Sequence, residues 1–152
     1  MKEYLTTDQS KELIDLGISP DCASMILWCA TQDFQNYPIK DQKWNYELKP
    51  FRPAVMGFES FTCLDVFTIG DLMKLLPHMI YIEQAGLEDW CNLNIQIYKD
   101  SVEICYDTWT DMGEGVGGTC HIGTDTIYEK EFIDGLFKLV KWCIANDKLN
   151  KQ

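Results

Sequence analysis

The residues with the clearest chemical potential are a cysteine and a histidine that follow each other in the sequence, Cys120 and His121. An imidazole beside a thiol can activate it as a nucleophile, which is the chemistry of a cysteine hydrolase. Neighbouring side chains usually point apart, however, and catalytic pairs normally meet through the fold. We therefore assign no catalytic residue and keep a Cys/His hydrolase only as an alternative.

A glycine-rich stretch precedes this pair and invites comparison with phosphate-binding loops. Gly113, Gly115 and Gly118 have the GxGxxG spacing of dinucleotide-binding proteins. That motif should open a helix, whereas about ten residues separate the stretch from the nearest helical pattern. The Lys-Ser/Thr pair of a P-loop is also missing. The sequence predicts a flexible loop over residues 110–127 and no nucleotide cofactor.

The potential metal ligands Asp111, Cys120, His121 and Asp125 are close in sequence, but their spacing matches no zinc or EF-hand pattern. The seven cysteines contain no CxxC pair, and their odd number argues against a disulfide framework. We predict no metal site and no cofactor.

The charge of the chain limits its partners. The net charge is −11, and Arg52 is the single arginine. Affinity for phosphate comes from clustered lysine and arginine, so direct nucleic-acid binding is disfavoured. An acidic surface suits solubility or a basic protein partner. A DNA-mimic inhibitor of a host DNA-binding protein is a further alternative.

No segment is long and apolar enough to cross a membrane. The longest apolar run, residues 25–30, is far shorter than the roughly 20 residues that a spanning helix needs. Acidic residues occupy the place where a signal peptide would be apolar. We therefore predict a cytoplasmic protein without a membrane partner.

The clearest structural pattern is an alternation of apolar and polar residues on both sides of Lys99-Asp100. It predicts an antiparallel hairpin over residues 92–107 with its apolar residues on one face. The expected pairs are Leu93 with Tyr106, Ile95 with Ile104, and Ile97 with Val102.

The other face of this hairpin is polar. It contains Asn94, Gln96, Glu103 and Asp107. Because a hairpin with one polar face covers the core on one side only, we take these four residues as the candidate binding surface.

The hairpin should pack against a C-terminal amphipathic helix over residues 132–144. The expected inward residues are Phe132, Ile133, Leu136, Phe137, Val140, Cys143 and Ile144. A third strand is expected at residues 78–83, with Gly86 in the connection.

Two shorter helices are expected nearer the N-terminus. Residues 6–17 have a capping-box spacing from Thr6 to Gln9, and residues 68–76 begin with Thr68 and Asp71. Their expected inward residues are Leu13, Ile14 and Leu16 in the first helix, and Ile69, Leu72, Met73, Leu75 and Leu76 in the second.

Residues 25–30 are expected to pass from a helical turn into a strand, and Trp44, Tyr46 and Leu48 suggest a short strand.

Strands followed by a helix, without regular βαβ alternation, indicate an α+β fold. At 152 residues the chain has the size of a single globular domain, residues 1–152.

Three segments together resemble a family. They are residues 5–20, beginning Leu-Thr-Thr-Asp-Gln-Ser-Lys-Glu-Leu, residues 68–77, and residues 132–143. The chain resembles a group of uncharacterised small proteins encoded in gut anaerobic bacteria and their prophages or mobile elements. The resemblance implies a bacterial or phage origin and a cytoplasmic location, and it transfers no site residue.

These observations favour a non-enzymatic protein-binding or accessory domain. No nucleophile, base, metal set or phosphate loop is assembled by the sequence. The polar hairpin face and the acidic loop over residues 110–127 are then the expected contact surface. We expect the partner to be a protein, and the negative charge of the chain favours a basic one.

Overall fold

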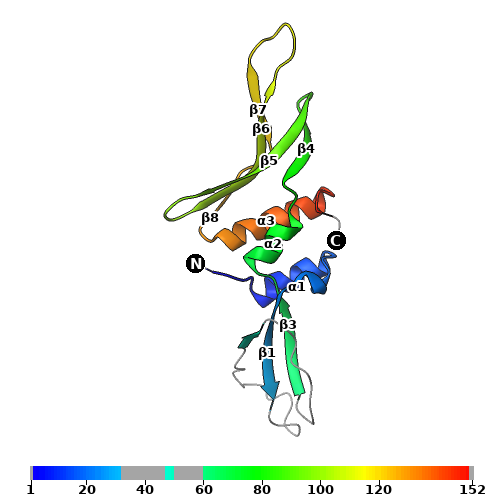
Figure 1. The fold of residues 1–152 in the computed structure, drawn as a ribbon, viewed down its shortest axis with the longest axis vertical. Helices are drawn as coiled ribbons and strands as arrows, with labels where there is room; N and C mark the ends of the chain where they lie inside the picture. The colour runs from blue at the N-terminus through cyan, green and yellow to red at the C-terminus, as the bar shows by residue number, and fades with distance from the viewer. Residues whose placement is uncertain (1, 32–46, 50–59, 151–152) are drawn as a thin grey trace. The chain divides into compact units, whose positions relative to one another are not determined.

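The computed structural model describes residues 2–31, 47–49 and 60–150. The chain forms two compact units, residues 4–71 and residues 1–3 with 72–152. The described part contains three α-helices and antiparallel sheets, with the C-terminal helix packed on a sheet (Figure 1). The predicted α+β class is confirmed. A single domain over residues 1–152 stays a prediction.

The first unit, residues 4–71, contains an antiparallel sheet with the order β2-β1-β3. Its elements are α1 (Thr7–Asp15), a 3-10 helix (Pro20–Cys22), β1 (Met25–Thr31), β2 (Glu47–Lys49), β3 (Ser60–Val66) and the start of α2 (Ile69–Leu75). Residues 25–30 are strand throughout, as part of β1, so only the strand part of that prediction is confirmed; the helical turn lies earlier, at Pro20–Cys22. Trp44 and Tyr46 lie outside the described residues.

Helix α1 begins and ends as the sequence predicts. The Gln9 amide donates to the Thr6 hydroxyl at 3.2 Å, and the Thr6 amide donates to the Gln9 side chain at 3.1 Å. Gly17 follows the helix with a φ of 102°, which suits glycine. Leu13 is buried, but Leu16 is 44% exposed. The inward prediction for Leu16 is wrong because this residue is the C-cap, where helical spacing no longer applies.

Asp71 organises the start of α2. One of its carboxylate oxygens, Oδ2, accepts hydrogen bonds from the amide and the hydroxyl of both Thr68 and Ser24, at 2.8–3.0 Å. Burial alone would raise the pKa of Asp71, but these hydrogen bonds outweigh it and lower the pKa below its ordinary value of 3.8. The Asp71 amide in turn donates to Thr68 Oγ1 at 3.3 Å, so the predicted helix start at Thr68 and Asp71 is confirmed.

The second unit contains the remainder of α2 and a five-stranded sheet with the order β4-β5-β6-β7, in which β8 also pairs with β6. Its other elements are β4 (Met79–Gln84), β5 (Leu87–Ile97), β6 (Val102–Asp111), β7 (Thr119–Gly123), β8 (Ile127–Glu129) and α3 (Phe132–Ala145). In α2, Leu72 and Leu75 are buried as expected. Met73 is 36% exposed, so that prediction is wrong: consecutive helical residues point about 100° apart.

The predicted hairpin register is confirmed. Leu93 pairs with Tyr106, Ile95 with Ile104, and Ile97 with Val102. Both strands are longer than predicted, because β5 continues backwards to pair with β4 and β6 continues forwards to pair with β7. Beyond the Asn92–Asp107 pair, which is the one farthest from the turn, β5 and β6 no longer pair with each other. From there the hairpins β4–β5 and β6–β7 extend away from α3 (Figure 1).

The region predicted as a flexible loop, residues 110–127, contains strand structure. Residues 119–123 form β7, and Ile127 begins β8. The glycine-rich residues form the connection between β6 and β7, and Gly113, Gly115, Gly117 and Gly118 all have positive φ. The prediction fails for β7 because backbone pairing with β6 needs no long apolar pattern, and Ile122 is its single fully buried side chain.

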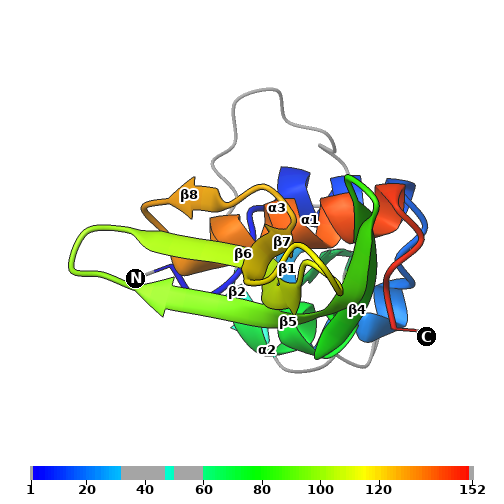
Figure 2. The same cartoon turned by 90° about the horizontal axis from the view of Figure 1, so that it is seen from above.

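Helix α3 packs on β6 and β8, as predicted for the inner face of the hairpin (Figure 2). A Cβ at Gly135 would lie 2.8 Å from the Cδ1 atom of Ile104, so glycine allows the helix to approach the strand closely. The buried residues of the helix are Ile133, Gly135, Leu136, Phe137, Leu139, Val140 and Cys143. In the described part of the chain, no helix has the length and apolar character to cross a membrane.

One expected core residue of the hairpin is exposed. Ile97 is 64% exposed, whereas its partner Val102 is buried. The prediction for Ile97 is wrong because the hairpin tip extends beyond the N-terminal start of α3 (Figures 1 and 2). The alternation correctly gives the face on which Ile97 lies, but it does not show how far α3 extends along that face.

Candidate functional site

The sheet of the second unit has one face turned away from α3, which we call the outer face. Paired residues of antiparallel strands share a face, and successive residues alternate between faces. The register therefore assigns a set of residues to the outer face. They are Met79, Tyr81, Glu83, Glu88, Trp90, Asn92, Asn94, Gln96, Glu103, Cys105, Asp107, Trp109, Asp111, Thr119, His121, Gly123 and Tyr128.

The structure places all four candidate binding residues on the outer face. Asn94 Nδ2 donates to Asp107 Oδ1 at 3.3 Å, and Gln96 lies opposite Glu103. The Tyr98 hydroxyl lies 2.7 Å from Gln96 Oε1 and 3.3 Å from Glu103 Oε2. The four residues thus form one surface, and their role in binding stays a prediction.

The pKa is raised for two tyrosines, Tyr81 on the outer face and Tyr98, whose hydroxyl contacts Gln96 and Glu103 of that face. Desolvation, followed by the negative charge of Glu103, raises the pKa of Tyr98. A hydrogen bond to Glu88 raises the pKa of Tyr81. Both hydroxyls therefore remain protonated donors next to carboxylates.

The structure adds a histidine and a tryptophan that sequence reasoning did not connect with this surface. His121 Nε2 lies 2.8 Å from Asp107 Oδ2. The His121 ring packs edge-on against Trp109, with ring centroids 5.3 Å apart and planes at 62°. Trp109 and His121 are register partners in the β6–β7 pair. Extending the alternation past Asp107 would have placed Trp109 on this face.

A second aromatic pair lies on the β4–β5 part of the outer face. The rings of Tyr81 and Trp90 are 5.6 Å apart, with planes at 65°. Trp90 shares the alternation of Asn92 and Asn94, which is the signal that could have found it. Next to this pair, Glu83 lies directly opposite Glu88, and both are exposed.

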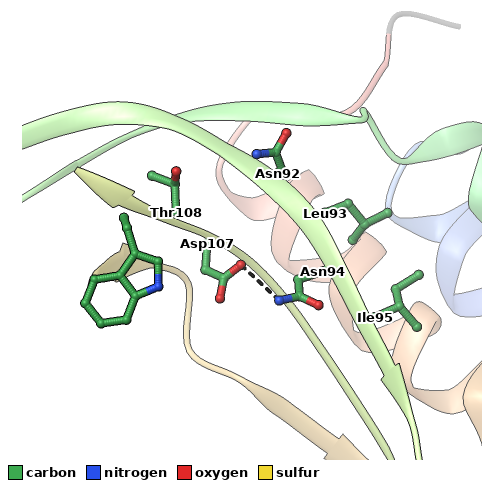
Figure 3. Close-up of a pocket in the computed structure, with 7 residues that line it drawn as sticks. Asn92, Leu93, Asn94, Ile95, Asp107 and Thr108 are labelled. Atoms are coloured by element: carbon green, nitrogen blue, oxygen red, sulfur yellow. Dashed lines mark hydrogen bonds between the residues drawn. The ribbon is translucent and has the colours of Figure 1, made fainter. Parts of the chain in front are cut away.

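A hollow of about 500 Å³ lies where β5 and β6 part. Its lining consists of Asn92, Leu93, Asn94, Ile95, Asp107, Thr108 and Trp109. Figure 3 shows Asn94 reaching from one strand to Asp107 on the other. Carboxylate and amide groups therefore meet at this point beside an exposed indole.

The structure does not bring together the side chains of Cys120 and His121, the candidates of the hydrolase alternative. Cys120 and His121 are consecutive in β7, so their side chains point to opposite faces. The Cys120 thiol donates to the backbone carbonyl of His121 at 3.6 Å. The thiol nearest to Asp107 on the outer face is Cys105, and burial, together with the negative charge of Asp107, raises its pKa. Neither thiol therefore has the surroundings of an activated nucleophile.

The two other chemical candidates from the sequence are the metal ligands and the glycine-rich stretch. In the residues that the structure describes, no group of three or more His, Cys, Asp or Glu side chains could hold a metal ion. The glycine-rich residues connect two strands and do not open a helix, as a dinucleotide-binding loop would. The outer face is thus the strongest candidate for a functional surface.

Comparison with known proteins gives no match: no family model fits the chain, and neither a curated protein sequence nor a solved structure is similar to it. The resemblance to proteins of gut anaerobes and their mobile elements stays a prediction.

Proposed function

We propose that this chain is a non-enzymatic protein-binding domain, and that its partner presents lysine or arginine side chains to the outer face. The observation that carries this proposal is the combination of exposed aromatic rings with carboxylates on one side of a sheet whose other side packs on α3.

The aromatic side chains supply contact area. Trp90 is 54% exposed, Trp109 68% and Tyr128 65%. Large aromatic side chains are enriched in the centres of protein interfaces, because they bury much apolar surface and keep a polar group for hydrogen bonding. Several such residues on one face support an interaction surface more strongly than isolated exposed apolar residues would.

The charges give the chemistry of the partner. Among the strand residues of the outer face, there are five acids and no lysine or arginine. The acids are Glu83, Glu88, Glu103, Asp107 and Asp111. Carboxylates and aromatic rings both attract cations, the former by charge and the latter by the negative faces of their rings.

The pair of glutamates in the β4–β5 hairpin supports the same partner. Glu83 and Glu88 lie directly opposite each other, an arrangement that destabilises a strand pair. A cationic side chain between them would relieve this repulsion. The arrangement is therefore unfavourable for the free sheet and favourable for a complex with a basic partner.

The alternative of a DNA-mimic inhibitor stays a prediction. Mimicry needs carboxylates spaced like phosphates, and the acids of the outer face are interleaved with aromatic and amide side chains. The mixture favours a basic peptide segment, whose side chains alternate between charged and apolar groups.

The test selects short random peptides that bind the immobilised full chain and then measures their affinities for variants. We expect the selected peptides to be rich in lysine and arginine. Glu103→Lys should weaken binding about five- to tenfold, because an attraction becomes a repulsion. The matched control is Asp15→Lys, which makes the same charge change at an exposed position in α1 and should leave the affinity unchanged.

Three results would contradict the proposal. Selected peptides could lack basic residues, or Glu103→Lys and Asp15→Lys could have equal effects. Neutral oligosaccharides, added as a further set of probes, could bind the outer face when basic peptides do not. Circular dichroism of both variants would verify that they remain folded.

A further inference from the structure

We propose that the hollow where β5 and β6 part is a subsite for one arginine side chain of the partner. This inference rests on the proposed function and names the group that the outer face recognises there. Its walls include the polar side chains Asn92, Asn94 and Asp107 and the indole of Trp109.

The carboxylate of Asp107 can accept a further charged donor. Asn94 Nδ2 lies 3.3 Å from its Oδ1 atom and His121 Nε2 lies 2.8 Å from its Oδ2 atom, while the Cys105 thiol is a third neighbour. A carboxylate has about four acceptor positions, so these contacts hold Asp107 in place and leave one position for a donor. Asn94 donates from its NH₂ group to Asp107, and its carbonyl oxygen can accept a hydrogen bond from a ligand.

Trp109 provides the flat surface that a guanidinium prefers. Its side chain is 68% exposed, although the edge-on ring of His121 packs against it at 5.3 Å. Trp109 lies two residues after Asp107 in β6 and therefore on the same face. One cation can then contact the carboxylate and the indole together.

Arginine fits this arrangement better than lysine does. The guanidinium is planar, has five donors and no acceptor, and stacks on aromatic rings, whereas an ammonium is a compact and strongly hydrated charge. The oxygens of Asp107 and Asn94 can accept hydrogen bonds from the guanidinium N–H groups, and the indole of Trp109 can stack on the guanidinium plane. A hollow of about 500 Å³ is large enough for the whole side chain.

The test titrates the ¹⁵N-labelled full chain with three short peptides that differ at one residue type: arginine, citrulline or lysine. Citrulline keeps the shape and the N–H groups of arginine but has no charge. The readout is the Trp109 indole N–H signal, assigned by its loss in Trp109→Phe, together with the dissociation constant. We expect the arginine peptide to shift this signal and to bind about fivefold or more tightly than either comparator.

A matched pair of variants locates the charge. Asp107→Asn should weaken the arginine peptide about five- to tenfold, because it removes the charge and keeps the shape. Asp147→Asn makes the same change at an exposed residue after α3 whose φ of 53° asparagine tolerates, so the affinity should not change.

The outcomes separate this inference from the proposed function. If the citrulline or the lysine peptide binds as tightly as the arginine peptide, the arginine subsite is wrong. The same holds if Asp107→Asn binds like the wild type. If in either case Glu103→Lys still weakens the selected basic peptides, the proposed function stands. If no basic peptide binds and no outer-face signal shifts, both are wrong. The citrulline comparison uses the wild-type chain and so does not depend on the folding of a variant.

Discussion

Replacing Gly123 with alanine introduces a methyl group between two strands that have no room for it. The added Cβ would lie 2.9 Å from the Cα atom of Asp107 and even closer to the carbonyl oxygen of Tyr106. Both are backbone atoms of β6, and real Cβ atoms essentially never come within 3.0 Å of such atoms. Strand β7 must therefore move away from β6, or its end must detach.

The expected cost follows from the kind of neighbour that is displaced. A side chain can rotate away, but a strand backbone can move only by losing hydrogen bonds and packing. We expect Gly123→Ala to lower the free energy of unfolding by about 2–3 kcal/mol, in the upper range for overpacking. For a chain of this size, that corresponds to a fall in Tm of about 5–10 °C. His121, two residues earlier, would move away from Asp107.

The assay is chemical and thermal unfolding followed by circular dichroism. The control is Gly70→Ala, where the added Cβ would meet one atom, Thr68 Oγ1, at an ordinary 3.7 Å. Alanine favours the helix at that position, so we expect a gain of up to about 1 kcal/mol. A Gly123→Ala protein within about 0.5 kcal/mol of the wild type would refute the close approach of β7 to β6 and the placement of His121 that depends on it.

Three further predictions concern buried groups. Asp71→Asn should weaken folding near neutral pH by about 1–3 kcal/mol; because the folded pKa of Asp71 is lowered, the wild type should lose this advantage as the pH falls below about 4, which unfolding curves at several pH values would test. Tyr106→Phe should cost about 1–2 kcal/mol in urea unfolding, since it removes the 2.6 Å hydrogen bond to the Pro77 carbonyl. Burial raises the pKa of Cys143 to about 11, so mass spectrometry after iodoacetamide treatment of the native protein should find this thiol unmodified, and its rapid modification would contradict the packing of α3.

The sequence predicts those features that depend on local pattern. The pairing of Ile95 with Ile104 follows from alternation on both sides of a short turn, and the start of α1 follows from the spacing of Thr6 and Gln9. The same alternation correctly places Asn94 and Asp107 together on the polar face.

Other features depend on distant parts of the chain. The contact of Trp109 with His121 requires a strand, β7, whose sequence has little apolar pattern and follows a glycine-rich connection. Its register comes from backbone pairing and from the absence of a side chain at Gly123, which a local pattern does not reveal. The exposure of Ile97 depends on where α3 begins relative to the hairpin tip.

The most direct test of the outer face as a contact surface is carbene footprinting of the full chain, read residue by residue, with and without a selected basic peptide. In the free chain, Trp90, Trp109 and Tyr128 should be labelled strongly and Tyr106 hardly at all, in keeping with their exposure. Adding the peptide should protect the three exposed aromatic residues. Unchanged labelling of all three, with protection confined to α1 or to α3, would show that the partner binds elsewhere.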